Sequence, residues 1–66
     1  MRVTVNGNQM DLQDGLAVSG LLGELGLSDR RVAVELNRAI LCKDGYCSAA
    51  LKDGDVVEVI SFVGGG

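Results

Sequence analysis

Residues 51–66 read LKDGDVVEVISFVGGG, a polar turn followed by an apolar run and a glycine-only end. The turn is predicted because Gly54 tolerates the positive φ that a tight reversal requires. The run from Val56 to Phe62 is apolar on both faces at most positions, which is typical of a central strand rather than an edge strand. This stretch therefore predicts a strand inside a sheet, with residues 63–66 leaving it as a glycine-rich tail.

The residues before this stretch predict further strands and one helix. Val3 and Val5 alternate with polar residues, as in a half-buried strand, and Asn6-Gly7 is a strong signal for a hairpin turn. Apolar residues spaced i, i+3, i+4 and i+7 from Val18 place one apolar stripe on a helix, and Gly26 is well placed to end it. The expected elements are strands near 1–6, 9–12, 32–36, 39–42 and 56–62, a helix at 18–25 and one helical turn at 47–50. This order predicts an α+β fold with a mixed sheet of about five strands and one main helix packed on one face.

Composition excludes several classes of function. The chain has 66 residues, which allows one domain, and it contains no histidine and only two cysteines. Imidazole-based catalysis and a four-ligand cysteine site for zinc or iron–sulfur are therefore excluded, and we expect no metal. Six basic residues against nine acidic ones, with one Phe and one Tyr, argue against nucleic acid. No apolar run is long enough to span a membrane and no signal peptide is evident, so a cytoplasmic location is expected.

The glycine tail is the feature most suggestive of function. Glycine has no Cβ, so residues 64–66 can pass through a slot too narrow for other residues. From Phe62 to Gly66 the chain can extend about 16 Å. The terminal carboxylate is the only ionised group of this arm. We therefore divide the chain into a folded domain at 1–62 and a flexible tail at 63–66 that presents a carboxylate to another protein, although glycine-rich termini are often simply frayed.

The sequence resembles the ThiS family of thiamine-biosynthesis sulfur carriers, which have a ubiquitin-like β-grasp fold. The resemblance spans nearly the whole chain and depends on the order of its motifs rather than on any one of them. The matching segments are Val5-Asn6-Gly7, Leu21-Leu22 through Leu25-Gly26-Leu27, Val32 to Asn37, and Leu51 to Val59 running into Phe62-Val63-Gly64-Gly65-Gly66. It is weaker at Ala17-Val18, where the family has a Thr cap, at Cys42-Lys43, where relatives have Pro-Arg, and at 46–50.

This resemblance implies a carrier rather than an enzyme. An E1-like adenylyltransferase would consume ATP and Mg²⁺ to adenylate Gly66, and a desulfurase-derived persulfide would convert it to a thiocarboxylate. Thiazole synthase would then accept the sulfur. Gly64 and Gly65 would provide clearance for the tail, and no cofactor would be bound by the chain itself.

A docking surface for such partners is predicted from the strand period. Val57 and Val59 are expected on one face of the last strand, with Val56, Ile60 and Phe62 on the other. Because one helix cannot cover both faces, some of these residues should remain exposed as a partner-docking patch. The alternative is that they only stabilise a small sheet.

Other functions remain open at this point. The same tail chemistry serves carriers for molybdopterin or cysteine synthesis, although the molybdopterin carriers tend to be longer, with a proline before the glycines. A β-grasp interaction module without tail chemistry, or a protein modifier joined to lysines, is a further alternative. Cys42 and Cys47 permit a disulfide or a reactive thiol, but we interpret Cys42 as a small apolar residue at a strand end. Asp53 and Asp55 are expected to satisfy backbone groups of the turn rather than to bind metal.

Overall fold

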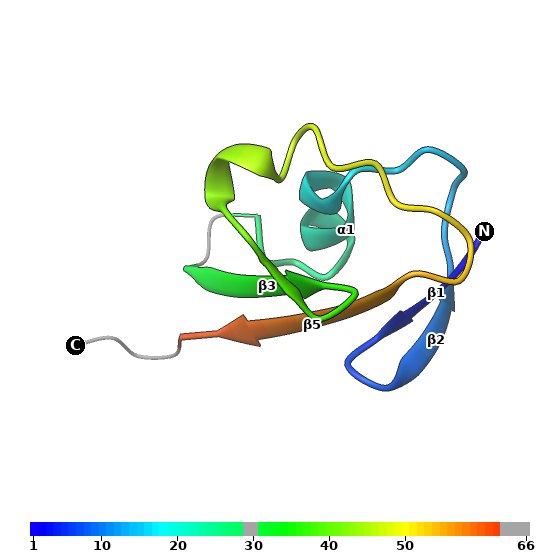
Figure 1. Cartoon of the computed structure of the whole chain (residues 1–66), viewed down its shortest axis with the longest axis horizontal. Coiled ribbons are helices and arrows are strands. Elements are labelled where there is room, and N and C mark those ends of the chain that lie inside the picture. Colours follow the sequence, from blue (N-terminus) through cyan, green and yellow to red (C-terminus); the bar gives the residue numbers. More distant parts are fainter. Residues whose placement is uncertain (29–30, 63–66) are drawn as a thin grey trace.

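The computed structural model describes residues 1–28 and 31–62, which form a five-stranded sheet with one α-helix on one face (Figure 1). The sheet order is β2-β1-β5-β3-β4; β1 and β5 run parallel and the other neighbours run antiparallel. The elements are β1 (Arg2–Val5), β2 (Asn8–Asp11), α1 (Val18–Glu24), β3 (Val32–Leu36), β4 (Ala39–Leu41), the 3-10 helix η1 (Lys43–Gly45) and β5 (Val56–Ser61). The predicted α+β class, mixed sheet and central last strand are confirmed.

Two tight hairpin turns use residues with positive φ. Asn6 and Gly7 have φ of 50° and 84°, and they connect β1 to β2 as predicted. Asn37 and Arg38 have φ of 51° and 70° between β3 and β4. Positive φ at both central residues gives a two-residue turn whose twist matches the twist of the flanking strands.

Helix α1 ends as the sequence predicts. Gly26 has φ of 74° and lies directly after the C-cap residue, Leu25. The Leu27 N–H donates to the Leu22 carbonyl at 2.7 Å, and the Gly26 N–H donates to the Gly23 carbonyl at 3.1 Å. This pair of bonds is a Schellman motif, which satisfies carbonyls that have no partner within the helix.

The beginning of α1 is stabilised by backbone groups rather than by a capping side chain. Ala17 at the N-cap makes no side-chain hydrogen bond. Instead, the Val18 N–H donates to the Ala49 carbonyl at 3.0 Å and the Ser19 N–H donates to the Tyr46 carbonyl at 2.9 Å. The segment at 46–50 therefore supplies the acceptors that a Ser or Thr cap supplies in other helices.

The expected helical turn at 47–50 is wrong. The short helix lies earlier, at Lys43–Gly45, and Ala50 forms an isolated antiparallel bridge with Ala17. The N–H groups of Ser48 and Ala49 donate back to the Gly45 carbonyl, so the turn continues η1, whereas the Ala49 carbonyl accepts from the Val18 N–H at the start of α1. The same segment places Tyr46 in the core, where its hydroxyl donates to the Val32 carbonyl at 3.3 Å.

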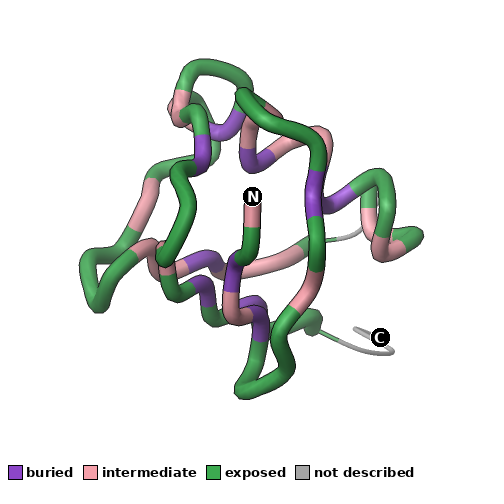
Figure 2. The backbone as a smooth tube through the Cα atoms, turned by 90° about the vertical axis from the view of Figure 1, so that its right-hand side faces the viewer, coloured by how far each residue is buried: buried purple, intermediate pink, exposed green. Residues whose placement is uncertain are grey.

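The core lies between α1 and the inner face of the sheet. Its most deeply buried side chains are Leu21, Val3, Val18, Val34 and Val57. Figure 2 shows that buried stretches of the chain are short and alternate with exposed ones. This alternation is what a single sheet covered on one face requires, since successive strand residues point to opposite faces.

Candidate functional site

Strand β5 connects the folded domain to the glycine tail. The predicted site residues Gly64, Gly65 and Gly66 lie outside the described residues. The last described backbone contact before them is the Phe62 N–H, which donates to the Arg31 carbonyl at 3.0 Å. The β3–β5 ladder therefore continues one residue beyond β5 itself, so the chain is held in the sheet up to Phe62.

On its other edge, β5 is held by β1 and by the side chain of Asn6. The Thr4 and Asn6 N–H groups donate to the carbonyls of Asp55 and Val57, each at 2.9 Å. Where β1 turns away, the Asn6 amide continues the pairing: the Val59 N–H donates to Asn6 Oδ1 at 2.7 Å, and Asn6 Nδ2 donates to the Val59 carbonyl at 3.2 Å. One asparagine side chain thus takes the place of a further residue of β1.

The turn before β5 is held in a similar way. The Asn37 Oδ1 accepts from the Val56 N–H at 2.9 Å, and Asn37 Nδ2 donates to Asp55 Oδ1 at 3.0 Å. Asp53 and Asp55 accept hydrogen bonds from the backbone N–H groups of Arg2 and Lys52, at 2.6 and 2.8 Å. The expectation that these carboxylates satisfy backbone groups of the turn is confirmed for Asp55, whereas Asp53 satisfies the N–H of Arg2 in β1.

The predicted division of β5 into two faces is observed. Val57 and Val59 are buried against the core, whereas Val56, Ile60 and Phe62 are 41%, 57% and 55% exposed. The last three alternate along one face, away from α1. The structure therefore places the three predicted docking residues together on the uncovered side of the sheet.

A fourth exposed apolar residue, Ile40 on β4, was not predicted. Its side chain is 81% exposed. The register pairs Ile40 with Glu35 and Glu35 with Glu58, and it pairs Ala33 with Ile60, so Ile40 lies on the same face as Ile60. We call Ile40, Val56, Ile60 and Phe62 together the open face. An isoleucine in a three-residue edge strand gives no sequence signal of which way it points, but the register of β4 decides it.

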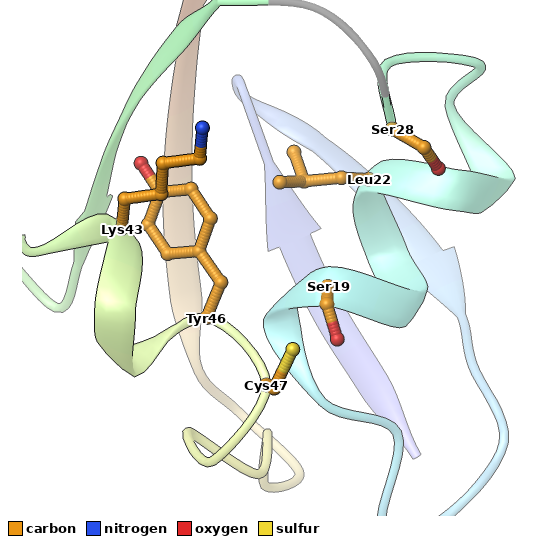
Figure 3. A pocket seen from close by; sticks show the side chains of 6 residues that line it. All are labelled: Ser19, Leu22, Ser28, Lys43, Tyr46 and Cys47. Carbon is orange, nitrogen blue, oxygen red and sulfur yellow. The ribbon is translucent and has the colours of Figure 1, made fainter.

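The two cysteines, Cys42 and Cys47, are both exposed and form no disulfide with each other. Cys42 directly follows β4, at the strand end where it was expected, but its side chain is exposed rather than buried as an apolar residue would be. Cys47 lines a pocket of about 240 Å³ together with Ser19, Leu22, Ser28, Lys43 and Tyr46. Figure 3 shows that these side chains come from two facing segments, α1 with the turn after it and the segment at 43–47. The pocket is thus on the helix side of the sheet.

The described part of the chain offers little for chemistry of its own. Residues 1–28 and 31–62 contain no group of three or more His, Cys, Asp or Glu that could hold a metal ion. In the same residues no helix is long and apolar enough to span a bilayer. What these residues do provide is a rigid strand that leads to the tail and an apolar face beside it.

Comparison with known proteins identifies the family. The family model described as the ThiS family matches residues 3–66. The chain belongs to the ThiS family. Its structure superimposes on the crystal structure of the thiamine biosynthesis protein ThiS from Geobacter metallireducens with a TM-score of 0.83 and 38% identity, covering 100% of both chains. The fold of this ThiS-family chain is therefore the ubiquitin-like β-grasp.

Three relatives illustrate the range of proteins in which this ThiS-like sequence occurs. The chain is 39% identical over 54 residues to the sulfur carrier protein ThiS of Bacillus subtilis, covering 82% of each. It is 42% identical over all of its 66 residues to a thiazole synthase of Paramagnetospirillum magneticum. The chain spans only 20% of that relative's length, and the same share of a second thiazole synthase, from Magnetococcus marinus.

Proposed function

We propose that this chain carries sulfur for assembly of the thiazole of thiamine, as a thiocarboxylate on Gly66. The observation that carries the proposal is the family match, which runs through the glycines at 64–66. The strand pairing that holds the chain up to Phe62 supports it further, because a tail is presented most effectively from a rigid base. In this proposal the chain is a carrier and not an enzyme.

The first step activates the carboxylate of Gly66. A carboxylate is a poor acyl donor because its leaving group would be oxide. An oxygen of the Gly66 carboxylate attacks the α-phosphorus of ATP, the bond to the β-phosphate breaks, and pyrophosphate leaves. An E1-like adenylyltransferase performs this step with Mg²⁺, which offsets the repulsion between the two anions. The product is an acyl-adenylate whose leaving group is AMP.

The second step installs sulfur. The terminal sulfur of a persulfide, supplied by a desulfurase, attacks the Gly66 carbonyl carbon and displaces AMP, which gives an acyl disulfide. A second thiol then attacks the other sulfur of that disulfide, the one bound to the persulfide donor; this breaks the S–S bond, forms a new disulfide with the donor and releases the thiocarboxylate. Gly64 and Gly65 provide clearance during both steps, since a Cβ at either position would widen the arm.

Thiazole synthase is the acceptor in this proposal. Two proteins named thiazole synthase each contain a stretch that matches all 66 residues of this chain. This match supports the thiazole pathway over the molybdopterin or cysteine pathways.

Intact-mass spectrometry tests the proposal. Incubation with the adenylyltransferase, ATP and Mg²⁺ is expected to add one adenylyl group, and addition of desulfurase and cysteine is expected to replace one oxygen by sulfur. The control variant lacks Gly65 and Gly66 and should show neither change. If the full chain shows neither mass change, the proposal is refuted. If the deletion variant still supports thiazole formation, the chain is an interaction module without tail chemistry.

A further inference from the structure

Two carboxylates lie among the residues of the open face, on the same side of the sheet. Glu35 on β3 and Glu58 on β5 are direct partners in the antiparallel register, and Ile40 on β4 is the next residue of the same row. Directly opposite residues on one face have Cβ atoms about 5 Å apart. Ile60 occupies the adjacent row, opposite Ala33. The two acidic side chains therefore lie side by side, with Ile40 next to Glu35 across the strands and Ile60 two residues after Glu58 on β5.

This arrangement costs the fold stability, because like charges directly opposite in a sheet repel each other. Within residues 1–28 and 31–62 the ion pairs are those of the N-terminus with Asp14 and of Arg2 with Asp11, and neither involves Glu35 or Glu58. Arg31 directly precedes β3, four residues before Glu35, and is thus about 13 Å away along an extended chain. A cationic group from outside the domain would offset the repulsion.

We propose that the open face binds a surface of the adenylyltransferase that presents an arginine side chain between Glu35 and Glu58. A guanidinium has five donors in a planar fork and can engage two carboxylates at once, whereas its aliphatic stem can pack on an isoleucine such as Ile40 or Ile60. This inference rests on the proposed function, which supplies the adenylyltransferase as a partner.

The chemistry of adenylation favours this partner over thiazole synthase. An enzyme that brings a carboxylate to the triphosphate of ATP needs cationic groups around the entrance to its site. The chain has a formal net charge of −3, so the same cationic surroundings attract the whole carrier. The carboxylate pair then fixes the orientation of the carrier on its partner, which apolar contacts alone would leave poorly defined.

Charge-removing variants test the inference. The variants are E35Q, E58Q and the double variant, and the matched control is E24Q combined with D44N. The control removes the same charge from exposed positions at the end of α1 and in η1. We would measure the Kd for the purified adenylyltransferase at low and high salt, and the denaturation midpoint of each carrier.

We expect the double variant to bind the adenylyltransferase more weakly without becoming less stable. The double variant should bind at least about tenfold more weakly, with a reduced dependence of Kd on salt, because charge-assisted hydrogen bonds are lost. Its denaturation midpoint should be equal to or higher than that of the unmodified chain, because the repulsion is relieved. The control should bind within about twofold of the unmodified chain.

Three outcomes would overturn the inference. The first is an unchanged Kd of the double variant for the adenylyltransferase, and the second is an equal loss of affinity in the control. The third is that the double variant loses affinity for thiazole synthase but not for the adenylyltransferase. The proposed function is judged separately. If the double variant is adenylated normally at saturating concentration and its Kd is unchanged, only the proposed arginine contact is refuted. If the unmodified chain is never adenylated, the proposed function is refuted whatever the Kd values are.

Discussion

Removing the Asn6 side chain should destabilise the domain by an amount that the structure allows us to estimate. The Asn6 amide makes two hydrogen bonds with the backbone of Val59, at 2.7 and 3.2 Å. A typical intramolecular hydrogen bond contributes a net ~1 kcal/mol to the free energy of unfolding, so N6G should lower it by about 2 kcal/mol. For a domain of this size, that loss lowers the melting temperature by about 8–16 °C.

A second substitution separates these hydrogen bonds from backbone strain. Asn6 has φ of 50°, which glycine adopts freely and alanine does not. N6A should therefore be less stable than N6G by about 1 kcal/mol, although both variants lack the two hydrogen bonds. Asn8, an exposed residue at the start of β2, provides the control variant N8A, which should change stability little.

Urea denaturation is the appropriate assay. Tyr46 is the sole tyrosine, and it is buried, so its fluorescence reports loss of the core alongside circular dichroism. Hydrogen exchange at the Val59 amide should accelerate in N6G, because that N–H donates to Asn6. If N6G unfolds within about 0.5 kcal/mol of the unmodified chain and the Val59 amide remains protected, the Asn6 side chain does not hold β5 and the reasoning is refuted.

Three further predictions concern the open face, the helix and the core. I60A should raise the KM for adenylation about three- to tenfold, because docking would bury the exposed half of a side chain whose full burial contributes about 1.5–3 kcal/mol. S61A, on the opposite face of β5, should leave KM unchanged, and equal KM values for the two variants would remove the docking role. G26A should lower the free energy of unfolding by more than ~1 kcal/mol because φ at this position is positive. G23A, where φ is not positive, should not show this loss, and circular dichroism melts of the two variants test the difference. L21A should lower the free energy of unfolding by about 2–5 kcal/mol, since Leu21 is fully buried, and a cooperative melt close to that of the unmodified chain would contradict its place in the core.

The elements that the sequence predicted are those with a clear period or a special backbone requirement. The stripe from Val18 to Leu25 and the glycine at 26 define α1 almost to the residue, because both the period and the positive φ are local properties. The alternation in β5 is similar: Val57 and Val59 are buried and Ile60 is exposed, as their positions predict.

The features that sequence reasoning missed depend on contacts between distant segments. The helical turn was placed at 47–50 because nothing local reveals that Ala49 accepts a hydrogen bond from Val18. The exposure of Ile40 depends on the register between β3 and β4. Asn6 was predicted as a turn residue, which is confirmed, but its pairing with Val59 spans 53 positions of the sequence and leaves no local pattern.

The candidate site was predictable only in part. The alternation of β5 predicts which of its residues share the open face, but it does not reveal Ile40 or the opposition of Glu35 to Glu58, which require the order β5-β3-β4. The chemistry assigned to Gly66 comes from the family resemblance and stays a prediction, since Gly66 lies outside the described residues.

The central position of β5 has a mechanical consequence. The strand that leads to the glycines is gripped along both edges, by β3 as far as Phe62 and by β1 with Asn6 as far as Val59. A partner that pulls on the end of the chain therefore loads many hydrogen bonds in shear at once, instead of peeling them apart one after another. A partner enzyme can therefore bind and pull on the C-terminal end without unfolding β5 from that end.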